Sequence, residues 1–123
     1  MPLDPPASAD SGPFDCRVVR DDTAAAVLAA CGEIDLSTRD RLLAALTSLF
    51  SDRRPLLLDL SQVTFIDCSA LRVLQTVHRA HDRFAVVAPS PPVQRLLHLA
   101  GARVTVYEGP DAALRALATD RPP

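Results

Sequence analysis

The pattern of hydrophobic and polar positions changes type within one stretch, residues 56–79. Its first residues are almost all apolar, which predicts a strand buried on both faces of a sheet. Its second half repeats apolar residues every three or four positions and so predicts an amphipathic helix. Between the two halves stand Asp67, Cys68 and Ser69, where the helix has free N–H groups and the positive end of its dipole. We therefore expect the functional groups of the protein at this junction.

The rest of the chain alternates between strand-like and helix-like patterns. Two weakly apolar runs on either side of a turn at 21–23 predict a hairpin. Ser37 and Asp40 resemble a capping box that begins a helix, and Ser90 before a proline begins another helix that ends at Gly101. The predicted strands are 16–20, 24–31, the run from 56, 84–88 and 104–107, and the predicted helices are 38–50, 70–79, the segment between Ser90 and Gly101, and 111–118.

This order of elements, β-β-α-β-α-β-α-β-α, predicts a single α/β domain. Strands that alternate with helices pair in parallel through right-handed crossovers, so we expect a mixed, mostly parallel sheet with helices packed on it. A chain of 123 residues suits one such domain. Residues 1–13, rich in Pro, Asp, Ser and Ala, are expected to be a disordered tail, 14–119 to form the domain, and 120–123 to fray.

Composition narrows the functional classes. The formal net charge is −2, with 13 basic and 15 acidic residues, which gives no electrostatic reason to expect nucleic-acid binding. No apolar run reaches the ~20 residues that a membrane helix needs, and no signal peptide is visible at the N-terminus. We expect a cytoplasmic protein that binds neither nucleic acid nor membrane.

The three cysteines, Cys16, Cys31 and Cys68, have neither Cys-x-x-Cys nor zinc-finger spacing, and their odd number in a cytoplasmic chain favours free thiols. A tight turn after the first strand would place Cys16 opposite Val27 or Leu28, about 10 Å of strand away from Cys31, so we expect no bond between those two. A bond between Cys31 and Cys68 stays conceivable, because both should lie near the carboxyl ends of adjacent strands.

Three short motifs occur in order along the chain: Gly32-Glu33-Ile34-Asp35, the run from Leu58 to Asp67, and Cys68-Ser69-Ala70-Leu71. Together with the stretch 88–101 they resemble the STAS domain, and most closely that of bacterial anti-sigma-factor antagonists. The resemblance covers about residues 16–118. It implies a protein that binds an anti-sigma factor, usually a kinase with an ATPase fold, and so releases a sigma factor. The partner-binding residues that it implies are Asp35, Asp67, Cys68, Ser69 and Arg72.

The resemblance also implies a phosphorylation switch, from which this chain departs. In the family the kinase phosphorylates a serine in an Asp-Ser-(Ser or Thr)-Gly motif at the start of a helix. Asp67 matches the Asp, Cys68 occupies the phospho-acceptor position, Ser69 matches the next residue, and Ala70 replaces the Gly. A thiol does not replace the hydroxyl in serine-kinase chemistry, and a methyl in place of Gly limits how closely a partner can approach. Ser69 is the remaining candidate phospho-acceptor, with helix capping as its alternative role.

Two other functions stay open. Oxidation of Cys68, alone or together with Cys31, would make the protein a thiol-based redox sensor. A helix N-terminus favours the reactive thiolate, although the neighbouring Asp67 opposes it by like-charge repulsion. Alternatively, the chain would be a STAS subunit of a larger assembly such as a transporter or a stressosome-like complex.

The sequence shows no recognisable catalytic constellation. It has no Gly-rich phosphate loop, Gly-x-Ser-x-Gly or His-Glu-x-x-His, and Asp35 with Asp67 lacks a third catalytic group. His78 and His81 have a spacing that can hold a metal, but no further ligand set is evident, so we expect none. Asp59 is expected at the frayed end of its strand, with a buried, paired carboxylate as the alternative. We therefore expect a non-enzymatic monomer or weak dimer without cofactor.

Overall fold

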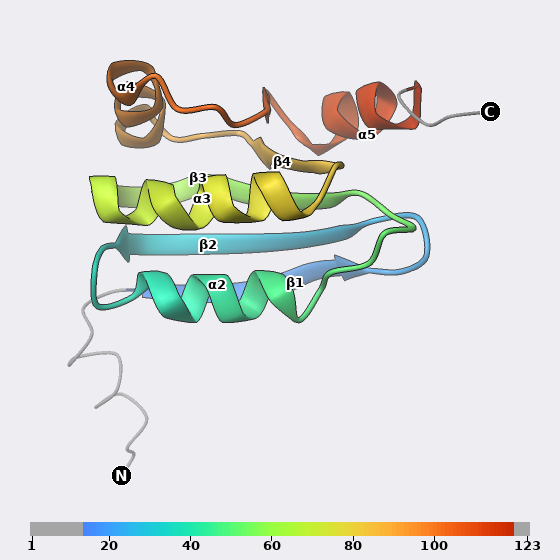
Figure 1. Cartoon of the computed structure of the whole chain (residues 1–123), viewed down its shortest axis with the longest axis horizontal. Coiled ribbons are helices and arrows are strands. Elements are labelled where there is room, and N and C mark those ends of the chain that lie inside the picture. The colour runs from blue at the N-terminus through green and yellow to red at the C-terminus, as the bar shows by residue number, and fades with distance from the viewer. Residues whose placement is uncertain (1–13, 120–123) are drawn as a thin grey trace, which may run out of the picture.

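The computed structural model describes residues 14–119, and within this range the chain forms a five-stranded sheet and four helices (Figure 1). In chain order the elements are β1 (Phe14–Asp21), β2 (Ala26–Ile34), α2 (Arg39–Thr47), β3 (Leu56–Ile66), α3 (Cys68–Ala80), β4 (Phe84–Val87), α4 (Pro91–Ala100), β5 (Val106–Tyr107) and α5 (Pro110–Thr119). This order confirms the prediction. The expectations for 1–13 and 120–123 concern residues outside the described range.

The strands lie in the sheet in the same order as in the chain, β1-β2-β3-β4-β5. β1 and β2 form an antiparallel hairpin, and each later pair of neighbours is parallel, so the mixed, mostly parallel sheet is confirmed. Parallel neighbours need crossover connections, which α2, α3 and α4 supply. The carboxyl ends of β2 and β3 therefore lie at the same end of the sheet as the starts of α2 and α3, on the left in Figure 1.

β3 is the centre of the fold because its first half is apolar on both faces. Leu56, Leu58 and Leu60 belong to a larger core beneath α2, α3 and α4, whereas Leu57 belongs to a smaller core beneath α5. These leucines are buried, and burying a leucine contributes about 1.5–3 kcal/mol. The larger core is closed by the apolar stripe of α3, which consists of Ala70, Leu71, Val73, Leu74 and Val77.

The register of the β1–β2 hairpin differs from the predicted one. Cys16 pairs with Ala30, next to Cys31, because the turn lies at 22–25 and a bulge at Val19 shifts the pairing. Adjacent positions of a strand face opposite sides of a sheet. Cys16 therefore packs against the larger core while Cys31 is exposed, and both thiols are free. The two side chains are kept apart because they lie on opposite faces of the sheet. The predicted reason, a distance along the strand, does not apply.

Two helices begin with hydrogen bonds that differ from the predicted ones. The prediction of a capping box at 37–40 is wrong, because the hydroxyl of Thr38, which precedes α2, donates to the Glu33 carbonyl (3.0 Å) and makes no cap hydrogen bond. The Ser90 hydroxyl likewise does not cap α4 but donates to the Val63 carbonyl (2.6 Å). Both hydroxyls are buried, and a buried donor needs a protein acceptor because water is excluded. They tie the starts of α2 and α4 to the sheet.

Asp59 lies inside β3 and not at its end, which corrects that expectation. The strand continues to Ile66, and the half-buried Asp59 carboxylate accepts a hydrogen bond from the Ser61 N–H (2.8 Å). This contact falls where the register between β2 and β3 shifts. The carboxylate therefore stabilises a local irregularity within the strand.

His78 lies in α3 and His81 is the C-cap of that helix, and the two contact different segments of the chain. His78 Nε2 lies 3.2 Å from the Thr105 hydroxyl, whereas His81 Nε2 donates to the Ser51 carbonyl (3.0 Å). Within residues 14–119 no group of three or more His, Cys, Asp or Glu side chains is placed to hold a metal ion. In the same range no helix is long and apolar enough to cross a membrane.

Candidate partner-binding surface

β2 and β3 end side by side and bring two aspartates to one end of the sheet. Ile34 pairs with Ile66 in the parallel register, and the N–H of Asp67 donates to the Ile34 carbonyl (3.2 Å). Asp35 and Asp67 are the next residues after these strands, so they are neighbours where α2 and α3 begin. Both residues are half-buried. The structure thus brings together the two aspartates that the resemblance assigned to one surface.

Asp35 fixes the loop between β2 and α2. Its carboxylate accepts hydrogen bonds from the Ser37 hydroxyl (2.7 Å), the Ser37 N–H (3.0 Å) and the Thr38 N–H (3.2 Å). These donors, the Ser37 hydroxyl foremost, stabilise the charged form and hold the pKa of Asp35 below its usual value. The loop is closed by the Thr38 hydroxyl, which accepts from the Asp35 N–H (2.9 Å). Leu36 in the same loop is 65 % exposed.

Asp67 is the N-cap of α3. Its carboxylate accepts hydrogen bonds from the Ala70 N–H (3.1 Å) and from the Ser69 hydroxyl (2.6 Å). Ser69 is therefore a donor to the cap and not the cap itself, which corrects the prediction. Ala70 is buried in the larger core, so its methyl group faces the interior and does not limit the approach of a partner.

Cys68 is the first residue of α3 and is exposed, while Asp67 and Ser69 on either side are half-buried. Arg72 is also exposed, and residues four apart share one face of a helix. Arg39 of α2 donates through Nη1 to the Ser69 carbonyl (3.3 Å) and so joins the starts of the two helices. The first turn of α3 is therefore both accessible and fixed in place.

The structure does not bring Cys31 to Cys68. Cys31 pairs with Gln62 within the body of β2 and is exposed on the face of the sheet that α3 does not cover, since its neighbour Ala30 is buried in the larger core. Cys68 lies at the start of α3, and both thiols are free. The sheet stands between the two cysteines, so a bond between them would require the fold to rearrange.

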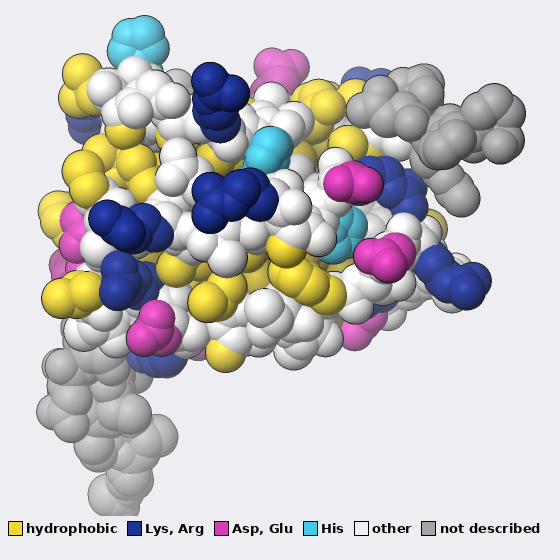
Figure 2. Space-filling model, viewed as in Figure 1, with side chains coloured by type: hydrophobic (Ala, Val, Ile, Leu, Met, Phe, Trp, Pro, Cys, Tyr) yellow, Lys and Arg dark blue, Asp and Glu magenta, His cyan; other side chains and the backbone are white. Residues whose placement is uncertain are grey.

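Two large hydrophobic side chains at this end, Leu36 and Phe65, were not predicted as site residues. Phe65 is 48 % exposed because Ile66 is buried and successive strand residues face opposite sides. The sequence did contain a signal for this exposed side chain. Phe65 and Ile66 are adjacent in one strand, so only one of them could face the larger core. Exposed apolar side chains beside charged groups are typical of protein–protein contact surfaces. Figure 2 shows hydrophobic, basic and acidic side chains together at its left edge, where α2 and α3 begin.

We call this surface the docking face and define it by its residues. They are Asp35, Leu36, Asp67, Cys68, Ser69 and Arg72. This definition combines Leu36 with the five residues that the resemblance implied. The loops of the docking face are fixed by hydrogen bonds of Asp35, Asp67 and Arg39, which suits contact with another protein.

Comparisons with known proteins agree with this fold. A family model, the STAS domain, matches residues 17–112. The structure of an anti-sigma factor antagonist from Mycobacterium paratuberculosis is 31 % identical to this chain, with a TM-score of 0.74 over 85 % of this chain and 94 % of that one. No curated protein sequence matches.

Two more distant structures share the fold. The Bacillus cell fate determinant SpoIIAA in its phosphorylated form is 17 % identical, with a TM-score of 0.59 over 88 % of this chain and 99 % of that one. The STAS domain of a SulP transporter from Vibrio cholerae is 21 % identical, with a TM-score of 0.58 over 83 % of this chain and 86 % of that one. Fold and family agree, and this chain is a STAS-domain protein of the anti-sigma-factor antagonist family.

Proposed function

We propose that this chain is a non-enzymatic cytoplasmic antagonist that binds an anti-sigma factor through the docking face and so releases a sigma factor. The observation that carries the proposal is the exposed first turn of α3, with Cys68 and Arg72 accessible beside the fixed Asp35 loop. The 31 % identity to an anti-sigma factor antagonist supports it. Standard interfaces bury about 1,600 Å² in total, so the docking face would form the centre of a larger contact.

We further propose that phosphorylation does not switch this antagonist off. Cys68 offers no hydroxyl at the position that the resemblance assigns to the phospho-acceptor. The neighbouring Ser69 hydroxyl donates to the Asp67 carboxylate at 2.6 Å. A phosphoryl group on Ser69 would remove this hydrogen bond and place a charge of about −1.5 to −2 beside a carboxylate. We therefore assign Ser69 a structural role.

Binding is tested with purified anti-sigma factors that have a kinase-type ATPase fold, by biolayer interferometry. Arg72→Ala and Leu36→Ala should each weaken binding by about tenfold, since interface truncations of this kind cost about 1–2 kcal/mol. The control is Arg95→Ala, which removes an exposed arginine from α4 and should leave the affinity unchanged. Equal weakening by Arg95→Ala, or no binding of any such partner by either wild type or Cys68→Ser, would argue against the proposal.

The switch is tested by adding ATP to the same mixtures and locating phosphate by site-resolved mass spectrometry. The wild type should stay unmodified at Ser69, and Cys68→Ser should be phosphorylated at position 68, because the substitution supplies a hydroxyl on an exposed helical turn. Phosphate on Ser69 of the wild type would contradict the proposal, because it would show that the kinase uses the residue next to position 68 as its acceptor.

A second function, a thiol-based switch, is favoured by one observation, the exposure of the Cys68 thiol on the docking face. If this switch operates, mild peroxide should add mass at Cys68 and lower the affinity for the partner. In the Cys68→Ala variant the same treatment should leave the mass at position 68 and the affinity unchanged. Peptide mapping must separate this site from Cys31, which is also exposed. An unmodified Cys68 under conditions that oxidise Cys31 would exclude this function.

A further inference from the structure

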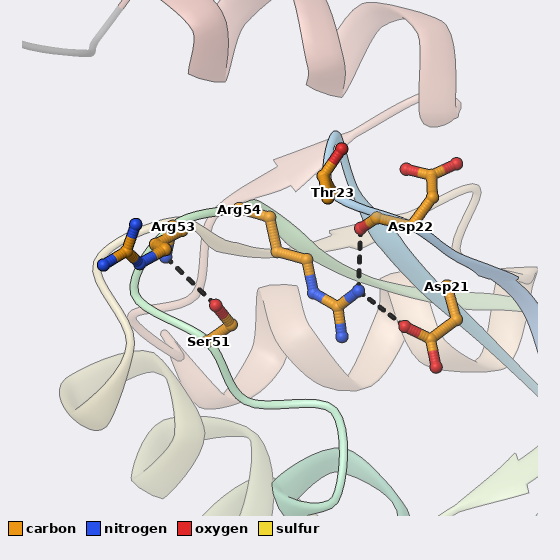
Figure 3. A pocket seen from close by; sticks show the side chains of 6 residues that line it. All are labelled: Asp21, Asp22, Thr23, Ser51, Arg53 and Arg54. Carbon is orange, nitrogen blue, oxygen red and sulfur yellow. Dashed lines mark hydrogen bonds and ion pairs between the residues drawn. The ribbon is translucent and has the colours of Figure 1, made fainter.

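The end of the sheet opposite to the docking face, where β2, β3 and β4 begin, carries two adjoining hollows. One has a volume of about 450 Å³ and is lined by Asp21, Asp22 and Arg54, among others (Figure 3). The other has a volume of about 270 Å³ and is lined by Arg20 and Arg83. The hollows share Thr23 and Arg53. Four arginines and two aspartates thus line them, in a chain whose formal net charge is −2.

One of these arginines, Arg54, has a structural role. Its Nη1 donates to the Asp21 carboxylate (2.6 Å) and to the Asp22 carbonyl (2.8 Å), and its Nη2 donates to the Leu49 carbonyl (3.1 Å). Only 14 % of its side chain is exposed. Arg54 therefore joins the β1–β2 turn to the end of α2, and its charge is balanced by Asp21.

The second carboxylate, Asp22, is also already engaged. It accepts hydrogen bonds from Arg20 Nε (2.9 Å), the Ala24 N–H (2.8 Å) and the Ala25 N–H (3.0 Å). These donors, with Arg20 first, lower the pKa of Asp22. In Figure 3 its carboxylate points away from Arg54 and from Arg53. Asp22 balances one charge at Arg20 and shapes the turn.

The remaining two guanidinium groups, those of Arg53 and Arg83, make no ion pair among residues 14–119. The loops that carry them are nevertheless fixed. His81 connects the two loops, because its Nε2 donates to the Ser51 carbonyl (3.0 Å) and its Nδ1 accepts from the Arg83 N–H (3.1 Å). Arg83 Nη2 also donates to the Asp52 carbonyl (3.4 Å). Fixed loops place both arginines at the smaller hollow before any ligand arrives, which lowers the entropic cost of binding.

From this arrangement we infer that the smaller hollow binds a small organic phosphate. Guanidinium groups match phosphoryl oxygens in geometry and charge, and Arg53 and Arg83 are available for that contact, with the Thr23 hydroxyl beside them. The rest of the lining includes Pro55 and Leu114, which suit an uncharged part of the same molecule. This site lies away from the docking face and does not depend on the proposed function.

The sheet topology does not oppose a site at this end. Ligands of open α/β sheets usually occupy the crevice where the strand order reverses, at the carboxyl ends of the strands. The described sheet has no such reversal, because β1 to β5 follow one another in order. Strand order therefore does not single out the carboxyl end as the ligand site, and the two hollows described above lie at the opposite end.

The test is a titration of the full chain with phenyl phosphate at constant ionic strength, followed by NMR chemical shifts. The shifts should move and saturate at residues around Arg53 and Arg83, and phenyl phosphate should bind more tightly than inorganic phosphate. Arg53→Gln and Arg83→Gln should each raise Kd by at least about tenfold, since each removes a charged hydrogen-bond donor. Arg95→Gln, which changes the net charge equally but lines neither hollow, should leave Kd unchanged within about twofold.

Several results would overturn the inference. The inference fails if the wild type shows no saturable chemical-shift changes at these loops. It also fails if the double variant, Arg53→Gln with Arg83→Gln, binds phenyl phosphate as tightly as the wild type. An equal loss in Arg95→Gln would show attraction by net charge alone, and equal affinity for inorganic phosphate would refute the apolar contact. Arg53 is exposed, so Arg53→Gln should fold normally and keeps the test valid even if Arg83→Gln loses structure.

Discussion

Asp67 makes three hydrogen bonds that shape the start of α3. Its N–H extends the pairing with β2 by donating to Ile34, its carboxylate caps α3 at Ala70, and the same carboxylate receives the Ser69 hydroxyl. A carboxylate at a helix N-terminus also interacts favourably with the helix dipole. The start of α3 within the docking face therefore depends strongly on this one side chain.

Replacing that side chain tests its contribution to stability. Asp67→Ala removes the acceptor for two hydrogen bonds and should lower the free energy of unfolding by about 1 kcal/mol, within the 0.5–2 kcal/mol typical of N-cap loss. Urea denaturation measures the change. The control is Glu108→Ala, at an exposed position between β5 and α5, which should stay within about 0.5 kcal/mol of wild type. The capping role is refuted if both variants are equally stable.

Asp35 makes part of the stability depend on pH. Its pKa is lowered in the folded state, so the unfolded chain binds a proton at a higher pH, near about 3.9, than the folded chain does. The contribution of Asp35 is therefore complete above about pH 5 and is lost progressively as pH falls from there through the lower, folded value. Asp35→Asn should destabilise the protein at pH 7 and progressively less towards pH 2, measured by urea denaturation at each pH. A difference that stays constant with pH would contradict this assignment.

At the residue scale the sequence located the strand-to-helix junction but not the hydrogen bonds around it. The change from strand pattern to helix pattern placed the junction at Asp67, Cys68 and Ser69 correctly. Asp and Ser are almost equally good N-caps, so the pattern could not decide between them. The decision depends on where α3 begins, which is Cys68 and not the predicted Ala70. Leu36 was missed because a single apolar residue in a polar turn carries no periodic signal.

At the scale of elements, α3 connects the larger core with the docking face. One side of the helix buries Leu74 and Val77, and the other exposes Cys68 and Arg72. The helix can present its first turn rigidly only because its apolar side is packed against the sheet. The docking face should therefore be sensitive to core substitutions that leave its own residues unchanged.

The packing of α3 is tested by Leu74→Ala. The side chain is buried completely, so the substitution leaves a cavity and should cost about 2–5 kcal/mol in the free energy of unfolding. Leu99→Ala is the matched control, since that leucine is 76 % exposed on α4 and its loss should cost less than about 0.5 kcal/mol. Urea denaturation compares the two. Similar costs for both variants would mean that α3 is loosely packed.

Elements with long periodic patterns were predicted better than the hairpin. Gly101 ends α4 as predicted, in the left-handed region at φ 60°. The hairpin register was wrong because Val18 and Val19 are both apolar and both exposed, at 50 % and 56 %, on an edge strand. An edge strand of this kind gives no alternation from which a bulge can be recognised.

At the scale of the whole molecule, β3 separates two different sites. The strand has eleven residues, and at about 3.3 Å per residue the docking face and the arginine-lined hollows lie about 35 Å apart. Groups at this distance without shared partners act independently. We therefore expect no coupling between partner binding and phosphate binding.

Independence is tested by exchanging variants between the two assays. Arg53→Gln should leave the affinity for the anti-sigma factor unchanged, and Arg72→Ala should leave the affinity for phenyl phosphate unchanged. In the double variant each affinity should equal that of the corresponding single variant within about 0.5 kcal/mol. Saturating phenyl phosphate that altered partner affinity in the wild type would instead show that the ends communicate.

The agreement between strand order and chain order has a consequence for how the protein is made. As the chain leaves the ribosome, β1 and β2 can pair with each other first, and β3, β4 and β5 then join one after another at the growing side. Within residues 14–119 no strand must enter between two that are already paired, so each step closes only the loop just synthesised. Assembly can keep pace with translation, but only the face of β3 in the larger core is covered once α3 follows it out, and the face that carries Leu57 stays exposed until α5 is made.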